Sequence, residues 1–182
     1  MTQFSAAALA RFCDVDLKTI HNWVARDALP SHRTPGRHLR FHRLDIIEFL
    51  NAYGHAVPKQ LDPVCPRVVM ACADGNVIAA ARRGIGKRAE IVGYDDAFEA
   101  IADLARVEPE MFLLDVSLLG SEALRCVRRL SKHPPTRHIR LVALAQASGV
   151  SSELMAAGAE RFVAGFVPLD IRIAIEDVLG LP

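Results

Sequence analysis

Beyond residue 66 the hydrophobic positions form short continuous runs, and each run is followed by a segment with helical spacing. Unbroken apolar runs are typical of strands buried on both faces, as in a parallel sheet covered by helices. The runs predict strands at residues 67–71, 90–93, 111–114, 139–145 and 162–164. Helices are predicted at residues 77–83, 95–106, 121–131, 151–157 and 169–179. This alternation predicts an α/β domain with a flavodoxin-like, doubly wound, five-stranded parallel sheet.

The pattern before residue 55 is different, because short amphipathic helices flank a hairpin. Ser5 and Asp16 stand where a side-chain oxygen can cap a helix, and they predict helices that end near residues 12 and 26. The predicted buried stripe of the second helix is Leu17, Ile20 and Val24, with Trp23 beside it. Its outward face is then Lys18, His21, Asn22 and Ala25. A third amphipathic helix is predicted at residues 43–53.

Between these helices the chain predicts a two-stranded hairpin that is strongly basic. Residues 29–34 and 38–42 flank the turn dipeptide Pro35-Gly36. The hairpin and the residue that follows it contain Arg33, Arg37, Arg40 and Arg43, with His32, His38 and His42. No acidic residue lies among them, although the net charge of the whole chain is only +1. The segment is either a focused contact for a polyanion or a solvated arginine-rich loop.

A proline-rich stretch separates the two patterns. Pro58, Pro63 and Pro66 exclude a continuous helix and favour an extended connector. The sequence therefore predicts a first domain at residues 1–54, a linker at 55–66 and a second domain at 67–182.

Composition narrows the classes of function. No apolar run approaches the roughly 20 residues that cross a bilayer, and the N-terminus does not resemble a signal peptide. The scattered cysteines are Cys13, Cys65, Cys72 and Cys126. Their spacing predicts idle thiols in a reducing cytoplasm rather than a metal site. No glycine-rich phosphate loop follows the first strand, so we expect neither a cofactor nor an enzyme. Because no apolar run is long enough to cross a bilayer, we also expect no membrane partner.

The predicted helices and hairpin have the geometry of a winged helix-turn-helix, in which the second helix enters the major groove of DNA. Asparagine can pair with adenine through two hydrogen bonds, and lysine or histidine can contact guanine or phosphate. Arginine side chains on the hairpin would lie along the flanking sugar–phosphate backbone. Double-stranded DNA is the partner that this arrangement predicts.

Residues 4–50 resemble the MerR/excisionase type of winged helix-turn-helix. The shared motifs are V-x-x-x-T-I-x-x-W, then L-P, P-G-R-x-x-R-F and D-I-x-x-F-L. The resemblance implies DNA contacts from the second helix and the wing. The predicted DNA-binding residues are Lys18, Thr19, His21, Asn22, Arg33, Arg37, His38, Arg40 and Arg43. His21 and Asn22 replace the Arg and Tyr that are common in MerR proteins, which implies either fewer contacts or a different specificity.

The second domain resembles the receiver domain of response regulators through M-F-L-L-D-V-S-L-L-G, in which Asp115 ends the third strand. In a receiver this aspartate accepts a phosphoryl group with help from Mg²⁺, an acidic pair, a Ser/Thr and a Lys. The positions that correspond to this site are Cys72, Ala73, Asp74, Asp115, Ala145 and Gly165. The supporting chemistry is missing, so the resemblance implies a degenerate receiver, or pseudo-receiver, with no catalytic residue.

Together these interpretations predict a bacterial, nucleoid-associated transcriptional regulator whose pseudo-receiver mediates dimerisation or a protein contact. The predicted dimer face is Leu154, Phe162, Ile171 and Ile175. A homodimer is favoured because two linked DNA-binding modules multiply affinity. Two alternatives stay open: a regulator switched by phosphorylation of Asp115, and a protein-binding adaptor that has recruited the winged fold.

Overall fold

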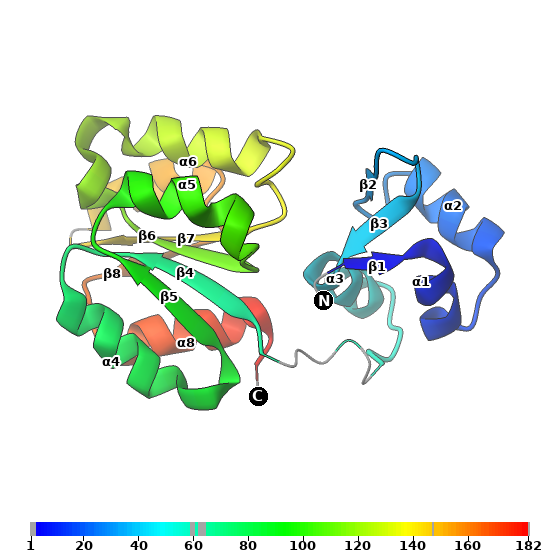
Figure 1. Cartoon of the computed structure of the whole chain (residues 1–182), viewed down its shortest axis with the longest axis horizontal. Coiled ribbons are helices and arrows are strands. Elements are labelled where there is room, and N and C mark those ends of the chain that lie inside the picture. The colour runs from blue at the N-terminus through cyan, green and yellow to red at the C-terminus, as the bar shows by residue number, and fades with distance from the viewer. Residues whose placement is uncertain (1–2, 59–60, 62–64, 147, 182) are drawn as a thin grey trace. The chain divides into compact units, whose positions relative to one another are not determined.

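The computed structural model describes residues 3–58, 61, 65–146 and 148–181. The chain divides into two compact units, residues 1–63 and 64–182 (Figure 1). Each unit has a hydrophobic core of its own. The two units are described separately below.

The N-terminal unit combines short helices with a three-stranded antiparallel sheet. Its elements are β1 (Gln3–Ser5), α1 (Ala6–Cys13), α2 (Leu17–Ala25), β2 (His32–Arg33), β3 (Leu39–His42) and α3 (Arg43–Ala52). The strand order is β1-β3-β2, so the hairpin gains a third strand from the start of the chain. Three-residue β1 is too short to produce a periodic pattern, and the sequence analysis missed it.

Both predicted helix caps are confirmed. The Ser5 hydroxyl accepts a hydrogen bond from the Ala8 amide at 3.2 Å, and the Asp16 carboxylate accepts one from the Thr19 amide at 2.6 Å. The hydrogen bond from Thr19 lowers the pKa of the Asp16 carboxyl from its ordinary value. The caps fix where α1 and α2 begin, and therefore which of their side chains face outward.

Helix α2 packs through fewer residues than its spacing predicts. Ile20 is fully buried, and the Trp23 ring packs against the Phe49 ring at a centroid distance of 4.7 Å. Trp23 therefore belongs to the core, as does the fully buried Phe41. Leu17, predicted to be buried, is 45% exposed. It lies in the first turn of α2.

Part of the predicted linker packs against the N-terminal unit. Leu61 is fully buried in the N-terminal core, and the His55 amide donates to the Leu50 carbonyl at 2.8 Å. The chain that follows α3 therefore completes the N-terminal unit, and the boundary between the units falls between residues 63 and 64.

The C-terminal unit is a five-stranded, wholly parallel sheet with the order β5-β4-β6-β7-β8, which confirms the predicted fold class. Its strands are β4 (Arg67–Ala71), β5 (Glu90–Tyr94), β6 (Met111–Asp115), β7 (Arg140–Ala145) and β8 (Arg161–Ala164). Its α-helices are α4 (Gly75–Ile85), α5 (Ala97–Val107), α6 (Ala123–Lys132), α7 (Ser151–Ala157) and α8 (Pro168–Leu179). Short 3-10 helices are η2 (Gly86–Arg88), η3 (Val116–Glu122) and η4 (Ser148–Val150).

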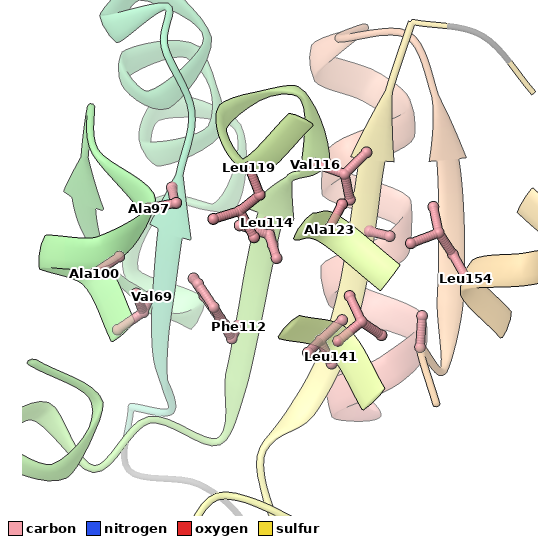
Figure 2. Packing of buried hydrophobic residues seen from close by; sticks show 14 of the residues in the cluster. Val69, Ala97, Ala100, Phe112, Leu114, Val116, Leu119, Ala123, Leu141 and Leu154 are labelled. Carbon is pink, nitrogen blue, oxygen red and sulfur yellow. The ribbon is translucent and has the colours of Figure 1, made fainter. Parts of the chain in front are cut away.

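Helices cover both faces of this sheet, with α5 and α6 on one face and α4 and α8 on the other (Figure 1). The core on the α5–α6 face packs Phe112 and Leu114 of β6 against Ala100, Ala123 and their neighbours (Figure 2). From β4 the chain first passes to β5 on one side, and β6 then pairs with β4 on its other side. The carboxyl ends of β4 and β6 therefore meet at the switch point, where doubly wound sheets place their functional residues.

Candidate functional site

The first candidate site is an open groove in the N-terminal unit. It has a volume of about 270 Å³ and lies between the start of α1, the first turns of α2 and the β2–β3 wing. Its lining residues are Ser5, Ala6, Ala7, Leu17, His21, Arg33, Arg37, His38, Leu39 and Arg40. The fold thus brings His21 together with four of the predicted wing residues, and it gives the exposed Leu17 a place beside them.

The outward face of α2 is available, as its spacing predicts. Lys18, His21 and Asn22 are exposed, because they lie opposite the buried Ile20. Thr19 is half-buried, and its amide already donates to the cap at Asp16. Lys18, Thr19 and Asn22 lie outside the groove. Three side chains of α2 are therefore free to meet a ligand directly, while Thr19 is turned partly toward the fold.

The wing turn holds an arginine in a conformation that favours glycine. The Arg37 amide donates to the Thr34 carbonyl at 2.7 Å, and the Thr34 amide donates to the His38 carbonyl at 3.0 Å. This turn places Arg37, and not the neighbouring Gly36, in the left-handed region with φ of 61°. A non-glycine residue there costs roughly 1–2 kcal/mol. The Arg37 side chain is exposed at the tip of the wing.

The wing arginines are not neutralised by carboxylates within the described part of the chain. Arg33 donates to the Arg37 carbonyl at 2.9 Å, and Arg40 donates to the Leu39 carbonyl at 3.1 Å. Each guanidinium has five N–H donors, so one backbone bond leaves most of its donors and its full charge available. The basic segment is a concentrated positive surface, held in place by its own backbone.

Arg43 is a correction to the predicted contact set. It begins α3, is only 4% exposed, and its guanidinium donates to the Leu61 carbonyl at 3.1 Å. The side chain turns inward because the carbonyl of the buried Leu61 needs a donor. Arg43 therefore holds the end of the N-terminal unit and does not belong to the exposed basic surface.

The second candidate site lies at the carboxyl end of β6 in the C-terminal unit. Asp115 is 2% exposed, and one of its carboxylate oxygens accepts from the Ser117 amide at 3.0 Å and from the Ser117 hydroxyl at 2.6 Å. Through these bonds Asp115 caps η3. One of its two carboxylate oxygens is thus engaged in a local structural role.

The positions that would carry an acidic pair do not suit Mg²⁺, which binds through oxygen ligands. Burial raises the pKa of the Cys72 thiol, with smaller contributions from the nearby Asp115 and Asp74 carboxylates, so the thiol is neutral at pH 7. Ala73 offers only a methyl group. Asp74 is exposed and caps α4 by accepting from the Asn76 amide at 2.8 Å. These residues do not fit the metal that a working receiver needs.

The remaining two positions have also lost their polar groups. Ala145 ends β7, and its carbonyl accepts from the Gly165 amide at 2.7 Å. Gly165 has a φ of 78°, a left-handed conformation in which a lysine would be strained. The backbone itself, and not only the side chain, has therefore departed from one that could present a lysine here.

The predicted dimer face is wrong. Leu154, Ile171 and Ile175 are at most 1% exposed, and Phe162 is half-buried against the main core. Figure 2 shows Leu154 within that core. Ile171 and Ile175 are one turn apart, on the stripe by which α8 packs on the sheet. Exposed apolar side chains in this region belong instead to Met155, Val167 and Leu169.

Comparisons with known proteins agree with this division of the chain. Residues 4–53 match the family of helix-turn-helix domains. No curated protein matches the chain in sequence. In the part that the structure describes, no helix is both long and apolar enough to span a membrane.

Solved receivers resemble the rest of the chain. A response regulator from Thermotoga maritima superposes with a TM-score of 0.57 at 17% identity, covering 64% of this chain and 98% of that one. For a putative response regulator from Chloroflexus aurantiacus J-10-fl, the TM-score is 0.55 at 21% identity, with coverages of 64% and 98%. The isolated REC domain of RcsB from Salmonella enterica serovar Typhimurium gives 0.55 at 17% identity, with coverages of 64% and 89%. The chain thus joins an N-terminal helix-turn-helix domain to a receiver-like α/β fold.

Proposed function

We propose that this protein is a DNA-binding transcriptional regulator of the MerR/excisionase type, with α2 in the major groove and the β2–β3 wing against the sugar–phosphate backbone. The observation that carries the proposal is the surface of the N-terminal unit. There the exposed face of α2 adjoins wing arginines that lack carboxylate partners among the described residues. Base-reading and phosphate-binding groups thus share one face, as direct readout requires.

Within this arrangement the residues have different roles. Asn22 is suited to adenine, and Lys18 and His21 are suited to guanine or phosphate. Arg37 and Arg40 are suited to phosphates, because a planar guanidinium matches two phosphate oxygens at once. Base contacts set the sequence preference, while the wing supplies affinity that falls with salt.

The decisive experiment is to select bound sequences from genomic DNA and then to titrate the selected duplex at several salt concentrations. Arg37→Gln/Arg40→Gln is expected to weaken binding at least tenfold and to lower the slope of log K against log salt by roughly 2. Arg11→Gln/Arg26→Gln is the matched control, since it removes the same charge from exposed positions outside the groove. Equal binding by both double variants and the parent would favour a protein-binding adaptor instead.

We further propose that the receiver-like unit does not transfer phosphoryl groups and serves as a pseudo-receiver. Support comes from the neutral Cys72 thiol, from Gly165 in a left-handed conformation, and from an Asp115 carboxylate engaged by Ser117. A dianionic phosphoryl group would meet no compensating cation there. Incubation with acetyl phosphate and Mg²⁺ should leave the intact mass of the protein unchanged. A phosphoryl adduct on the parent protein that is absent from the Asp115→Asn variant would favour the alternative, a regulator switched by phosphorylation of Asp115.

Dimerisation through the C-terminal unit remains part of the proposal, with a different face from the one that the sequence predicts. Val167 and Leu169 are half-exposed apolar residues at the start of α8, and Met155 is exposed on α7. Two tethered DNA-binding units would bind a two-fold site with a gain from effective concentration. Measurement of mass in solution tests this, with Leu169→Ser as the variant. A parent protein that is monomeric at micromolar concentration, with and without DNA, would end the dimer hypothesis.

A further inference from the structure

Helix α6 carries a second basic surface, in the C-terminal unit and away from the degenerate receiver residues. Between Glu122 and Glu153 the sequence has no acidic residue. The cations in that interval are Arg125, Arg128, Arg129, Lys132, Arg137 and Arg140. The first four belong to α6, and all four are exposed. The near-neutral charge of the whole chain therefore conceals acid-free basic segments in both units, at residues 28–44, 75–89 and 123–152.

These four cations, which we call the α6 surface, share one side of the helix. Their spacing of three, four and seven residues places them within about one third of its circumference. The opposite side packs inward through Val127 and Ala123. With His133 and Pro134, the α6 surface lines a shallow groove of about 390 Å³. The cations thus form one continuous face and are not scattered over the domain.

The arrangement opposes the stability of the helix. Like charges three or four residues apart repel one another, and the α6 surface contains four such pairs. Among the described residues its one carboxylate partner is Glu122, at 3.5 Å from Arg125. Helices α5 and α8 instead use opposite charges at this spacing, in Asp103–Arg106 and Arg172–Glu176. The helix dipole favours cations in the last turn, which accounts for Arg129 and Lys132 but not for Arg125 and Arg128.

We propose that the α6 surface binds the sugar–phosphate backbone of the DNA duplex that the N-terminal unit binds. This inference rests on the proposed function. Arg125 and Lys132 are separated by about 10 Å along the helix axis, which is close to the axial rise of about three nucleotides of one strand. A polyanion with regularly repeated charge suits a regularly repeated row of cations.

A protein partner fits this surface less well than DNA. Protein interfaces have an apolar centre, and no large exposed hydrophobic side chain lies on α6, all of which the structure describes. The α6 surface is also part of the same chain as the helix-turn-helix. Once the N-terminal unit is bound, neighbouring phosphates are at high effective concentration, so a weak contact of a few charges contributes measurably to affinity.

The test compares two double variants of the full-length protein on the selected duplex. Arg128→Gln/Lys132→Gln removes an arginine and a lysine four residues apart from the α6 surface. Arg83→Gln/Lys87→Gln removes the same pair, at the same spacing, from an exposed region elsewhere in the C-terminal unit. The α6 variant is expected to bind about tenfold more weakly at 0.1 M salt, with a salt slope lower by roughly 2. The control should stay within about twofold of the parent.

The outcomes separate this inference from the proposed function. If the wing variant Arg37→Gln/Arg40→Gln loses binding while the α6 variant keeps the parental affinity and slope, the regulator stands and the α6 contact is wrong. If neither the parent nor any variant binds duplex DNA, the proposed function is wrong, and the α6 contact that rests on it is wrong as well. If the α6 variant binds DNA normally but no longer binds vesicles that contain phosphatidylserine, the surface belongs to a membrane and the inference is overturned.

Discussion

The two units of this chain differ in how their arginine side chains are satisfied. In the C-terminal unit most described arginines pair with acids, as in Arg88 with Glu176 at 2.6 Å and Arg161 with Asp177. In the N-terminal unit, Arg33 and Arg40 bond only to carbonyls of their own hairpin, within the described residues. Lack of a partner does not by itself mark an interaction surface, since the exposed Arg11 and Arg26 also have no carboxylate partner among the described residues. The wing differs because its cations are clustered in a segment without acids, which the net charge of +1 for the whole chain does not reveal.

The units differ equally in how much their folds depend on their functional residues. The sheet of the C-terminal unit is held by Phe112, Leu114 and the helices that cover them, so its fold does not depend on the polar groups around Asp115. In the N-terminal unit the groove is formed by the same wing and helices that build the small core. Loss of core packing there should therefore remove function as well as stability.

Removal of a core phenyl ring from one unit at a time should have the largest effect. Phe41→Ala is expected to destabilise the N-terminal unit by about 3–5 kcal/mol, close to the whole stability of so small a core. DNA binding should disappear. Trp23, the single tryptophan, reports on this unit by fluorescence, and far-ultraviolet circular dichroism is dominated by the larger unit. Phe112→Ala should destabilise the C-terminal unit, as seen by circular dichroism, and leave the unfolding transition reported by Trp23 unchanged. Simultaneous loss of both transitions in either variant would contradict independent cores.

A substitution at the tip of the wing should separate binding from stability. Arg37 has a φ of 61°, so Arg37→Gly is expected to relieve strain and to stabilise the N-terminal unit by about 1 kcal/mol. The same change removes an exposed cation and should weaken DNA binding about tenfold. Urea unfolding followed by Trp23 fluorescence, with a DNA titration, measures the two effects. Lower stability together with unchanged affinity would mean that Arg37 is held by contacts of the fold.

The sequence predicts the architecture well because its signals are local. Both ends of each predicted strand of the parallel sheet lie within one residue of the observed ends, because every buried run is bounded by polar or turn residues. Burial of individual side chains was less predictable. Leu17 satisfies the helical spacing but lines the open groove beside the wing. Arg43 follows the wing in sequence, but its guanidinium donates to the carbonyl of Leu61. Both errors depend on contacts between residues that are distant in sequence.

The failed dimer face has a different origin, because its signal was present in the sequence. Ile171, Ile175 and Leu179 recur every four residues along α8, and a repeated apolar stripe on a sheet-covering helix faces the sheet. The resemblance to receivers points to this region but does not separate the stripe that packs on the sheet from the outer side of the helix. The sequence does not single out the α6 surface, since a row of cations on a helix is also typical of a solvated face.

A single neutralisation on α6 should test the repulsion argument with a small, signed effect. Arg128→Gln removes two like-charge pairs without touching the last turn, and we expect it to stabilise the C-terminal unit by roughly 0.5 kcal/mol at low salt. Arg129→Gln removes two pairs but also a favourable interaction with the helix dipole, so its net effect should be near zero. Urea unfolding followed by circular dichroism gives both values. A destabilised Arg128→Gln would mean that this side chain is a structural element of the domain.

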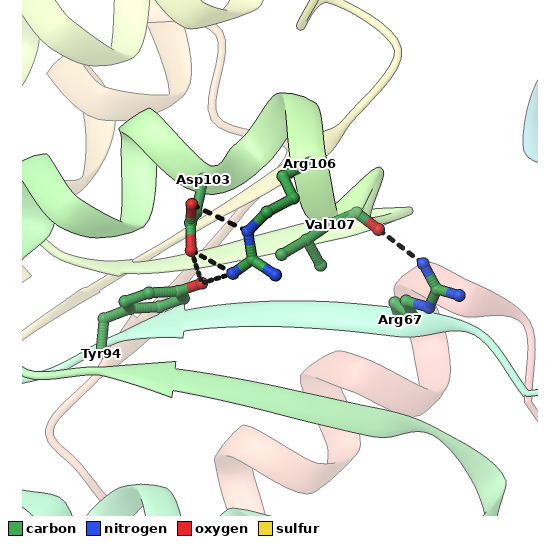
Figure 3. Close-up of polar contacts among 5 residues, drawn as sticks. All are labelled: Arg67, Tyr94, Asp103, Arg106 and Val107. Carbon is green, nitrogen blue, oxygen red and sulfur yellow. Dashed lines mark hydrogen bonds and ion pairs between the residues drawn. The ribbon is translucent and has the colours of Figure 1, made fainter.

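The smallest expected effect concerns the paired arginines of the C-terminal unit, which are the counterpart of the unpaired wing. Arg106 bonds to Asp103, whose carboxylate also accepts from the Tyr94 hydroxyl at 2.6 Å (Figure 3). The hydrogen bond from Arg106, followed by that from Tyr94, lowers the pKa of Asp103 from 3.8 to about 2. A carboxyl whose pKa is lower in the folded state stabilises the fold above its unfolded pKa, and this contribution is lost as the pH falls from 4 toward 2.

Substitution of either donor should therefore flatten the pH dependence of unfolding between pH 4 and pH 2. Arg106→Gln should flatten it more than Tyr94→Phe, because the Arg106 hydrogen bond is the larger cause of the lowered pKa. The contacts lie at the surface, so 0.5 M salt should reduce the difference between parent and variant. Urea unfolding of the C-terminal unit at pH 2.5 and pH 4.5 measures the effect. Identical slopes for the parent and Arg106→Gln would mean that this pair is not formed in solution, and that paired and unpaired arginines no longer distinguish the two units.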